Sequence, residues 1–413
     1  MATAPQSELA PDPFDMSRPE LYSEDRWQEP FRELREKAPV YRVPHSEVGA
    51  YWNISSYAEI SAVEALPEIY SSSWVHGGIT ILDRPDDAEI ELPMFIAMDE
   101  PEHTSRRRVV APMFTPTMMR DMEADIRRRT AEVLDALPYG RQFDWVDTVS
   151  IELTTQMLAI LFDFPWEDRR KLTEWSDWFG DTEIFKDTEL RHQRLAKVYE
   201  MGGYFKQLWD AKQGKAETPD LLSMMIHSQA MADMSPEEFM GNLILLIVGG
   251  NDTTRNSMSA FAYALDRFPN ERRKYEDNPS EALIVNATHE MIRWQTPLAH
   301  MRRTAVADHE LAGQSIKAGD KVVLWYLSGN RDDRVFDRPD DVILDRENAR
   351  RHLAFGYGIH RCVGARLAEL QLKILLEEMA KRRMRVHVTG EVTRTHASFV
   401  HGFRKVEVEL ERY

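Results

Sequence analysis

The sequence predicts one mainly α-helical domain with small β-sheets beside the helices. Apolar residues recur every three or four positions from about residue 118 to 300, which is the period of a helix. Shorter β-like stretches stand before and after this region. No internal repeat, low-complexity tract or Gly/Ser-rich linker divides the 413 residues, so a single domain is expected over 21–413. Residues 1–20 contain four prolines and are expected to form an irregular arm.

The strand-like segments lie on both sides of the helical region. Residues 38–54 alternate enough between apolar and polar side chains to suggest a β-hairpin. Residues 302–327 are rich in strand-forming residues, and the Ala312-Gly313 and Ala318-Gly319 pairs supply turns within them. Two closing strands are expected near 383–389 and 404–411.

The longest predicted helix begins at Pro236. Ser235 is a typical N-cap, Pro236 suits the first helical position and Glu238 completes a capping box. Nothing interrupts the pattern until Pro269, so the helix should span about 33 residues, or roughly 50 Å. Its segment 242–250 is apolar on every side, which predicts that the helix crosses the interior of the fold.

Residues 249–254 of this helix break several local rules at once. Gly249 and Gly250 each cost about 1 kcal/mol relative to alanine, and the Asp252 carboxylate is costly to bury unless it is paired. Such violations often mark functional sites, because glycines let a flat ligand lie against the backbone and Thr253 can bond back to a carbonyl. The alternative is a packing notch where another helix crosses, with Asp252 in an ion pair.

The only cysteine, Cys362, excludes an intramolecular disulfide and any multi-cysteine metal site. It follows the glycine-rich stretch FGYGIHR and precedes a helix expected from Ala365 to about Lys381. Glycines let backbone N–H groups turn toward the sulfur, and a helix start stabilises an anion. The pattern therefore predicts a thiol with a lowered pKa that can bind a metal. The alternative is an inert buried cysteine.

Overall charge and hydropathy exclude several classes of function. The chain has 52 basic and 69 acidic residues, a net charge of −17, which disfavours nucleic acid as a partner. No apolar run approaches the roughly 18 to 20 residues of a membrane helix, and the first 20 residues do not resemble a signal peptide. We therefore expect a cytoplasmic protein without a transmembrane anchor, and a monomer.

Three motifs together resemble those of the cytochrome P450 family. Residues 355–364 match its haem-binding loop, Phe-Gly-x-Gly-x-x-x-Cys-x-Gly, at every fixed position. Residues 249–254 are similar to the oxygen-activation motif of its long central helix, and Glu290 and Arg293 to its Glu-x-x-Arg pair. The resemblance implies the cytochrome P450 fold, haem b as cofactor and Cys362 as the iron ligand.

The same resemblance implies further contacts to the haem. His103 and Arg107 lie on one face of a short helix, where they would otherwise be a solvated basic turn. The residues implied to hold the two propionates are His103, Arg107, Arg303 and His360, and further implied haem contacts are Gly250, Phe355 and Gly364.

The resemblance also implies the chemistry. A thiolate-bound haem favours the cleavage of dioxygen, and the cytochrome P450 enzymes are the usual example of this effect. Asp252 and Thr253 would be the catalytic pair that delivers protons. Electrons would come from NAD(P)H only through a reductase and a ferredoxin, which would dock at a basic patch formed by Arg106, Arg108, Arg361 and Arg366.

Several blocks of sequence, among them 92–103 and 290–303, resemble the bacterial alkane and fatty-acid ω-hydroxylases. That family oxidises the terminal methyl group of medium-chain aliphatic compounds. The implied substrate-lining residues are Ile81, Leu82, Leu245, Val248, Leu298, Ala299, Phe399 and Val400. Alternatively, these apolar residues belong to the packed core and do not contact the substrate. Other functions left open are a monooxygenase of terpenoids or steroids, a peroxygenase that uses hydrogen peroxide directly, and a non-catalytic haem carrier or sensor.

Overall fold

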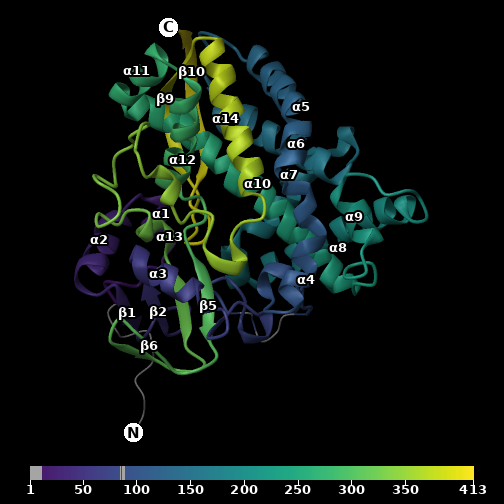
Figure 1. Ribbon diagram of the computed structural model, residues 1–413, viewed down its shortest axis with the longest axis vertical. Helices are drawn as coiled ribbons and strands as arrows, with labels where there is room; N and C mark the ends of the chain where they lie inside the picture. The colour runs from purple at the N-terminus through teal and green to yellow at the C-terminus, as the bar shows by residue number, and fades with distance from the viewer. Residues whose placement is uncertain (1–11, 84, 86–88) are drawn as a thin grey trace.

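A computed structural model describes residues 12–83, 85 and 89–413 of the chain. Its core is a bundle of helices around α10, with small sheets at its edges (Figure 1). The longer helices are α2 (Gln28–Lys37), α3 (Tyr57–Glu64), α4 (Glu102–Val110), α5 (Pro116–Asp135), α6 (Glu152–Phe162), α7 (Arg170–Gly180), α8 (Thr188–Lys212), α10 (Pro236–Arg267), α11 (Pro269–Asp277), α12 (Glu281–Gln295) and α14 (Ala365–Lys381). The shorter helices are α1 (Glu20–Ser23), α9 (Leu221–His227) and α13 (Tyr326–Gly329).

Helix α10 confirms the predicted central helix. Ser235 caps it as expected, since its Oγ accepts a hydrogen bond of 3.1 Å from the Glu238 amide. The helix has 32 residues and ends at Arg267, just before the chain turns into α11 at Pro269. The predicted bounds of α14 are also confirmed.

The strands form three sheets. The five-stranded sheet has the order β1-β2-β8-β5-β3, the second sheet has the order β4-β10-β9, and β6 pairs with β7. The bounds are β1 (Val40–Val43), β2 (Tyr51–Ile54), β3 (Tyr70–Ser71), β4 (Phe143–Asp144), β5 (Met301–Ala305), β6 (His309–Leu311), β7 (Gln314–Ile316), β8 (Lys321–Leu324), β9 (Met384–Arg394) and β10 (Phe403–Arg412).

These pairings confirm the predicted strand regions. Strands β1 and β2 form the expected antiparallel hairpin, and β9 pairs with β10. Ala312 and Gly313 turn the chain with φ of 49° and 76°, and Gly319 turns it with φ of 92°. Strand β4 was not predicted, because two residues inside a helical region carry no alternating pattern.

The apolar core shows what α10 does in the fold. One cluster gathers its first half, from Met240 to Ile247, with side chains of α5, α6, α7 and α8. A second cluster gathers its last part, from Met258 to Leu265, with α12, α14, β9 and β10. The segment between them, 248–257, contains the residues that break the helix rules. The unusual sequence therefore lies where the two halves of the core meet.

The predicted irregular arm is only partly described. Residues 1–11 lie outside the described residues. Residues 12–19 form turns that pack on the protein, since Met16 is fully buried and its amide donates to the Tyr51 hydroxyl at 2.9 Å. Among the residues that the structure describes, no helix is long and apolar enough to cross a membrane.

Candidate functional site

The cysteine loop is a tight turn in front of α14. The Cys362 amide donates to the Phe355 carbonyl at 2.8 Å, and Gly356 and Gly358 both have φ of 68°. The Gly364 amide hydrogen-bonds the sulfur, as the glycine pattern predicted. Desolvation by the surrounding protein nevertheless outweighs this amide and the nearby arginines and raises the pKa of the Cys362 thiol, although the residue is exposed on one side. The predicted lowering of that pKa is therefore wrong for the polypeptide by itself, and a bound metal cation would have to stabilise the thiolate.

Four basic side chains converge beside this loop. His103 and Arg107 come from α4, Arg303 from β5 and His360 from the 3-10 turn Gly358–His360. The rings of His103 and His360 lie 4.1 Å apart, and Arg107 donates to the Arg361 carbonyl. Burial, and then the charges of Arg303, His103 and Arg107, lower the pKa of His360 to about 2. The structure thus gathers all four residues that the resemblance assigned to the propionates.

The cluster contains buried nitrogens without partners. Among the described residues, His103 Nε2 and His360 Nδ1 have no hydrogen-bond partner, while His103 Nδ1 faces the Glu100 carboxylate at 3.5 Å. Such atoms are rare in folded proteins. Two arginines and two imidazoles with free donor capacity suit ionised carboxylates. The residues present therefore fit a group that carries two carboxylates, as haem does.

Asp252 is buried and linked to the surface. Its Oδ1 accepts hydrogen bonds from Ser176 at 3.0 Å and Arg255 at 2.8 Å. Arg255 also donates to Asp177 at 2.8 Å, and the Asp177 side chain is 39% exposed. Burial raises the pKa of Asp252 to about 6, although Arg255 acts in the opposite direction. The carboxyl group can therefore exchange a proton near neutral pH at the inner end of a polar chain.

The residues beside Asp252 on α10 distinguish a functional role of the glycine pair from a role in helix packing. Thr253 Oγ1 donates to the Gly249 carbonyl at 2.9 Å, as predicted, and can still accept a hydrogen bond. A Cβ at Gly249 would meet no atom within 4 Å, whereas a Cβ at Gly250 would lie 2.8 Å from Leu158 of α6. Gly250 is thus a packing notch, and Gly249 belongs to an accessible face with Thr253. The predicted contact of Gly250 with the cofactor stays a prediction.

The residues assigned to the substrate fall into two groups. Leu245 and Val248 are partly accessible and lie about two turns and one turn before Thr253 on α10. Residues 298–300 run beside residues 398–400, where Leu298 bridges Val400 and the Ala299 amide donates to the Phe399 carbonyl at 2.8 Å.

The loop that carries Ile81 and Leu82 contacts the second group, residues 298–300. The Ile81 amide donates to His300 Nε2 at 3.3 Å. Ile81 and Ala299, however, are 2% and 0% exposed and pack with Trp325 in a hydrophobic cluster, with Leu82 at its edge. Core packing accounts for Ile81 and Ala299, so this geometry does not favour their assignment as lining residues.

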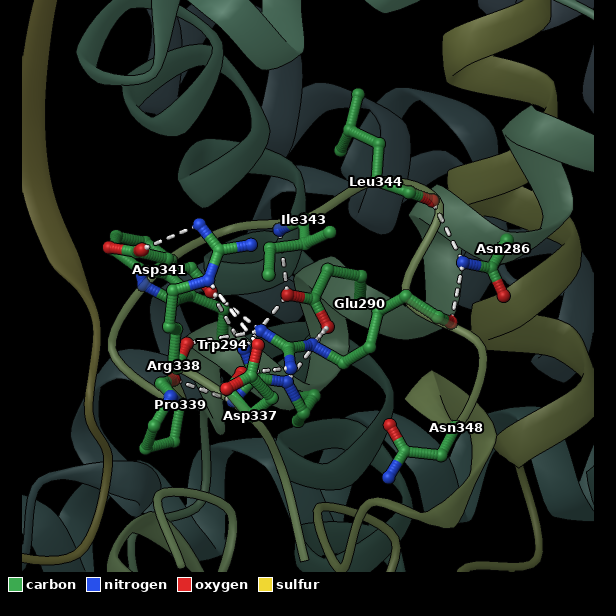
Figure 2. Close-up of polar contacts among 12 residues, drawn as sticks. Asn286, Glu290, Trp294, Asp337, Arg338, Pro339, Asp341, Ile343, Leu344 and Asn348 are labelled. Atoms are coloured by element: carbon green, nitrogen blue, oxygen red, sulfur yellow. Dashed lines mark hydrogen bonds and ion pairs between the residues drawn. The ribbon is translucent and has the colours of Figure 1, made fainter. Parts of the chain in front are cut away.

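The Glu290–Arg293 pair is fully buried and locks the chain behind the site. Arg293 donates to both Glu290 oxygens at 2.8 Å. Arg293 also donates to the carbonyls of Asn330 and Pro339, and Arg346 donates to Glu290 at 2.9 Å. Figure 2 shows Glu290 beside the segment that contains Pro339 and Ile343. This network joins α12 to the irregular segment that precedes the cysteine loop.

Comparison with known proteins agrees with this geometry. The family model for Cytochrome P450 matches residues 104–394, which is more than half of the chain. The chain belongs to the cytochrome P450 family. The structure of CYP153D17 from Sphingomonas sp. PAMC 26605 superposes with a TM-score of 0.92 at 65% identity, over 97% of this chain and 100% of that one.

More distant relatives extend over nearly the whole P450 chain. Linalool 8-monooxygenase of Pseudomonas putida is 34% identical over 408 residues, 96% of this chain and 98% of the relative. A methyl-branched lipid omega-hydroxylase of Mycobacterium tuberculosis is 30% identical over 392 residues, 92% of this chain and 90% of the relative. The predicted P450 fold and monooxygenase activity are confirmed.

In this P450, Cys362 would hold the haem iron, and the cluster of His103, Arg107, Arg303 and His360 would hold the propionates. When bound, haem with a thiolate ligand supplies the activation of O2. The roles of Phe355 and Gly364 as haem contacts stay predictions. The structure places the Phe355 ring 5.2 Å from the His352 ring and the Gly364 amide against the sulfur of Cys362.

A basic groove of about 720 Å³ lies beside the cysteine loop of this P450, and sequence reasoning found Arg361 and Arg366 of its lining but missed Arg350 and Arg351. Its cationic lining residues include Arg350, Arg351, Arg361 and Arg366. Among the described residues none of these four lies within ion-pair distance of a carboxylate, although Glu369 also lines the groove and interacts electrostatically with Arg350, Arg361 and Arg366. Arg106, in contrast, pairs with Glu238 at 2.7 Å, and neither Arg106 nor Arg108 lines the groove, so their assignment to a docking patch stays a prediction that this geometry does not favour. The adjacent pair Arg350-Arg351 was the sequence signal for this surface.

Proposed function

We propose that this P450 hydroxylates the terminal methyl group of medium-chain alkanes or fatty acids. The observation that carries the proposal is a partly accessible apolar stretch of α10, where Leu245 and Val248 precede Thr253 by eight and five residues. An aliphatic chain would lie against the apolar side chains with its end near the proton-delivering hydroxyl. The blocks shared with ω-hydroxylases, and the omega-hydroxylase among the relatives, support the same substrate class.

Selectivity for the terminal carbon has to come from shape, because a terminal C–H bond is stronger than its internal neighbours. We place Leu298, Phe399 and Val400 opposite α10 as the second wall of a narrow channel. Their backbones are cross-linked by the Leu298–Val400 bridge and the Ala299–Phe399 hydrogen bond, so the wall is held in place. Such a channel would admit a chain end-on.

The test uses the haem-loaded protein with a ferredoxin, its reductase and NAD(P)H. Octane and dodecanoic acid are offered separately, and mass spectrometry locates the hydroxyl group. The expected products are mainly 1-octanol and the ω-hydroxy acid. Mostly subterminal products would contradict the end-on channel, and no product despite normal reduction would contradict the substrate class.

A terpenoid is the second candidate substrate, because linalool 8-monooxygenase aligns along nearly the full chain at 34% identity. Linalool is therefore offered in the same assay. Faster turnover of linalool than of either straight chain would favour this alternative. Absence of product from all three compounds, despite normal reduction, would mean that the substrate belongs to another class.

We assign the groove beside the cysteine loop to an acidic electron donor, a ferredoxin. The chain as a whole has a charge of −17, so attraction must come from a local surface such as the unpaired arginines of the groove. Arg361→Glu should slow reduction by ferredoxin more at low salt than at high salt. Arg273→Glu on α11 makes the same charge change outside the groove and serves as the control. Equal effects of the two variants would contradict the assignment. That the protein is a cytoplasmic monomer stays a prediction.

A further inference from the structure

A buried carboxylate lies under the cysteine loop although no sequence motif contains it. Glu64 is the last residue of α3 and is 5% exposed. Its Oε1 accepts hydrogen bonds from the Tyr326 hydroxyl at 2.5 Å and from Arg303 at 3.3 Å. Its Oε2 accepts one from the Tyr357 amide at 2.8 Å. One side chain thus joins α3 to β5, to α13 and to the loop that carries Cys362.

The backbone of the cysteine loop packs closely against Glu64. A Cβ at Gly358 would lie 2.4 Å from the Glu64 carbonyl oxygen, and one at Gly356 would lie 3.4 Å from Glu64 Oε1. Both glycines have positive φ, so other residues would be strained there as well. The loop therefore rests directly on the end of α3, and its path depends on where Glu64 lies.

The negative charge of Glu64 faces the positive charge of Arg303. Arg303 is 4% exposed, and Glu64 is its ion-pair partner among the described residues. Arg303 is also one of the four basic residues that converge on the propionate site. An apolar residue at position 64 would leave the Arg303 charge, the Tyr326 hydroxyl and the Tyr357 amide with fewer acceptors in a buried place, which is unfavourable.

We propose that Glu64 is a positioning residue of the haem site. Its carboxylate holds the Tyr357 amide, and with it the cysteine loop, at one oxygen. At the other oxygen it holds the Arg303 guanidinium in the orientation that the propionate site requires. The proposal rests on the cofactor site of the P450 and does not depend on the identity of the substrate.

The test compares Glu64→Gln with the unaltered holoprotein. Glutamine keeps the shape and one acceptor but removes the charge that faces Arg303. We expect transfer of haem to apomyoglobin to become about ten-fold faster, because a charge-assisted hydrogen bond is lost. The reduction potential of the haem should also rise, since removal of a nearby negative charge favours the reduced iron. Glu64→Asp, which keeps the charge, should restore the potential.

Two further variants keep the test decisive. Glu68→Gln changes the charge equally at an exposed position four residues away and should leave both readouts unchanged. Tyr326→Phe removes one bond to Glu64 but no charge, so it should speed haem transfer without the rise in potential, and it covers the case in which Glu64→Gln does not fold. An unchanged transfer rate in Glu64→Gln, or a lower unfolding temperature with an unchanged potential, would overturn the proposal.

Discussion

Asp252 and Thr253 are neighbours in the sequence but face different parts of the molecule. Successive side chains of an α-helix point about 100° apart. The Asp252 carboxylate therefore contacts Ser176 of α7 and Arg255, while the Thr253 hydroxyl lies on the accessible face with Gly249. The pair thus connects the chain of polar groups that leads to Asp177 with the face where we place the substrate.

Replacement of Thr253 tests the role in proton delivery that we assign to its hydroxyl group. Thr253→Ala should keep haem and substrate binding but lower the product formed per NAD(P)H consumed several-fold, because the hydroxyl that positions the proton is lost. Product and hydrogen peroxide are measured together, and the lost product should reappear as peroxide. Ser257→Ala, one turn further along α10, removes a hydroxyl that bonds the Thr253 carbonyl and is the control. Unchanged coupling in Thr253→Ala would show that the role is wrong.

A substitution of Arg293 tests how much its buried ion pair with Glu290 stabilises the fold. Arg293→Lys keeps the charge but loses the two-fold contact with Glu290 and bonds to three carbonyl groups. The expected loss of unfolding free energy is about 3 kcal/mol or more, because a buried partner is left incompletely paired. Denaturant unfolding and the yield of haem-loaded protein measure it. Arg267→Lys at the exposed end of α10 should cost less than about 0.5 kcal/mol.

At the scale of the elements, α10 combines two ordinary helix halves with an unusual middle. Its apolar residues serve one cluster up to Ile247 and the other from Met258 onward. Apart from Val248, the residues between them are polar or small, and Gly250 lets α6 approach closely through Leu158. The glycine pair therefore has two roles, since Gly250 is used for helix packing and Gly249 keeps a face of the helix open.

The packing role of Gly250 gives a prediction. Gly250→Val should lower the unfolding free energy by about 1–3 kcal/mol, because its branches would overlap Leu158. The double variant with Leu158→Ala should recover part of this loss, which denaturant unfolding can measure. Gly203→Val in α8 is the control, since nothing lies within 4 Å of a Cβ there. Equal losses of unfolding free energy in Gly250→Val and Gly203→Val would contradict the role of Gly250 as a packing notch.

At the scale of the whole molecule, buried neutral histidines make the fold sensitive to acid. Burial lowers the pKa of His300 to about 4 and that of His352 to about 3. His300 shows why the neutral form is needed, because its Nδ1 contacts the Ser398 carbonyl while its Nε2 accepts from the Ile81 amide. A proton on Nε2 would break the second bond and separate the two segments that His300 joins.

The sign of the pH dependence follows from these pKa values. The unfolded chain binds protons on these histidines below about pH 6.5, whereas the folded protein does so only near pH 4 or lower. Their contribution to stability is therefore present above pH 6.5 and is lost as the pH falls from 6.5 toward 4. The unfolding temperature should fall over this interval, and His300→Gln should reduce the slope. A slope unchanged in this variant would show that His300 is not responsible.

The features that could be predicted from the sequence are those that depend on near neighbours. Ser235, Pro236 and Glu238 identify the start of α10 from adjacent residues only, and the alternation in 38–54 identifies the first hairpin, so both were predictable. Strand β4 was not, because it exists only by pairing with β10. The four basic residues of the cofactor site came from a family resemblance. Glu64 and Asp177 belong to no motif and become visible only through their distant partners.

The sequence by itself determined the class of the fold, the central helix and the cysteine that identifies the family. These features depend on residue types at short, regular spacings. Only the tertiary structure decided the pKa direction of Cys362, the different roles of Gly249 and Gly250, and the position of Glu64 under the cysteine loop. Burial and long-range contacts cause these three properties. They depend on residues that are far apart in the chain and come together only when the helices pack.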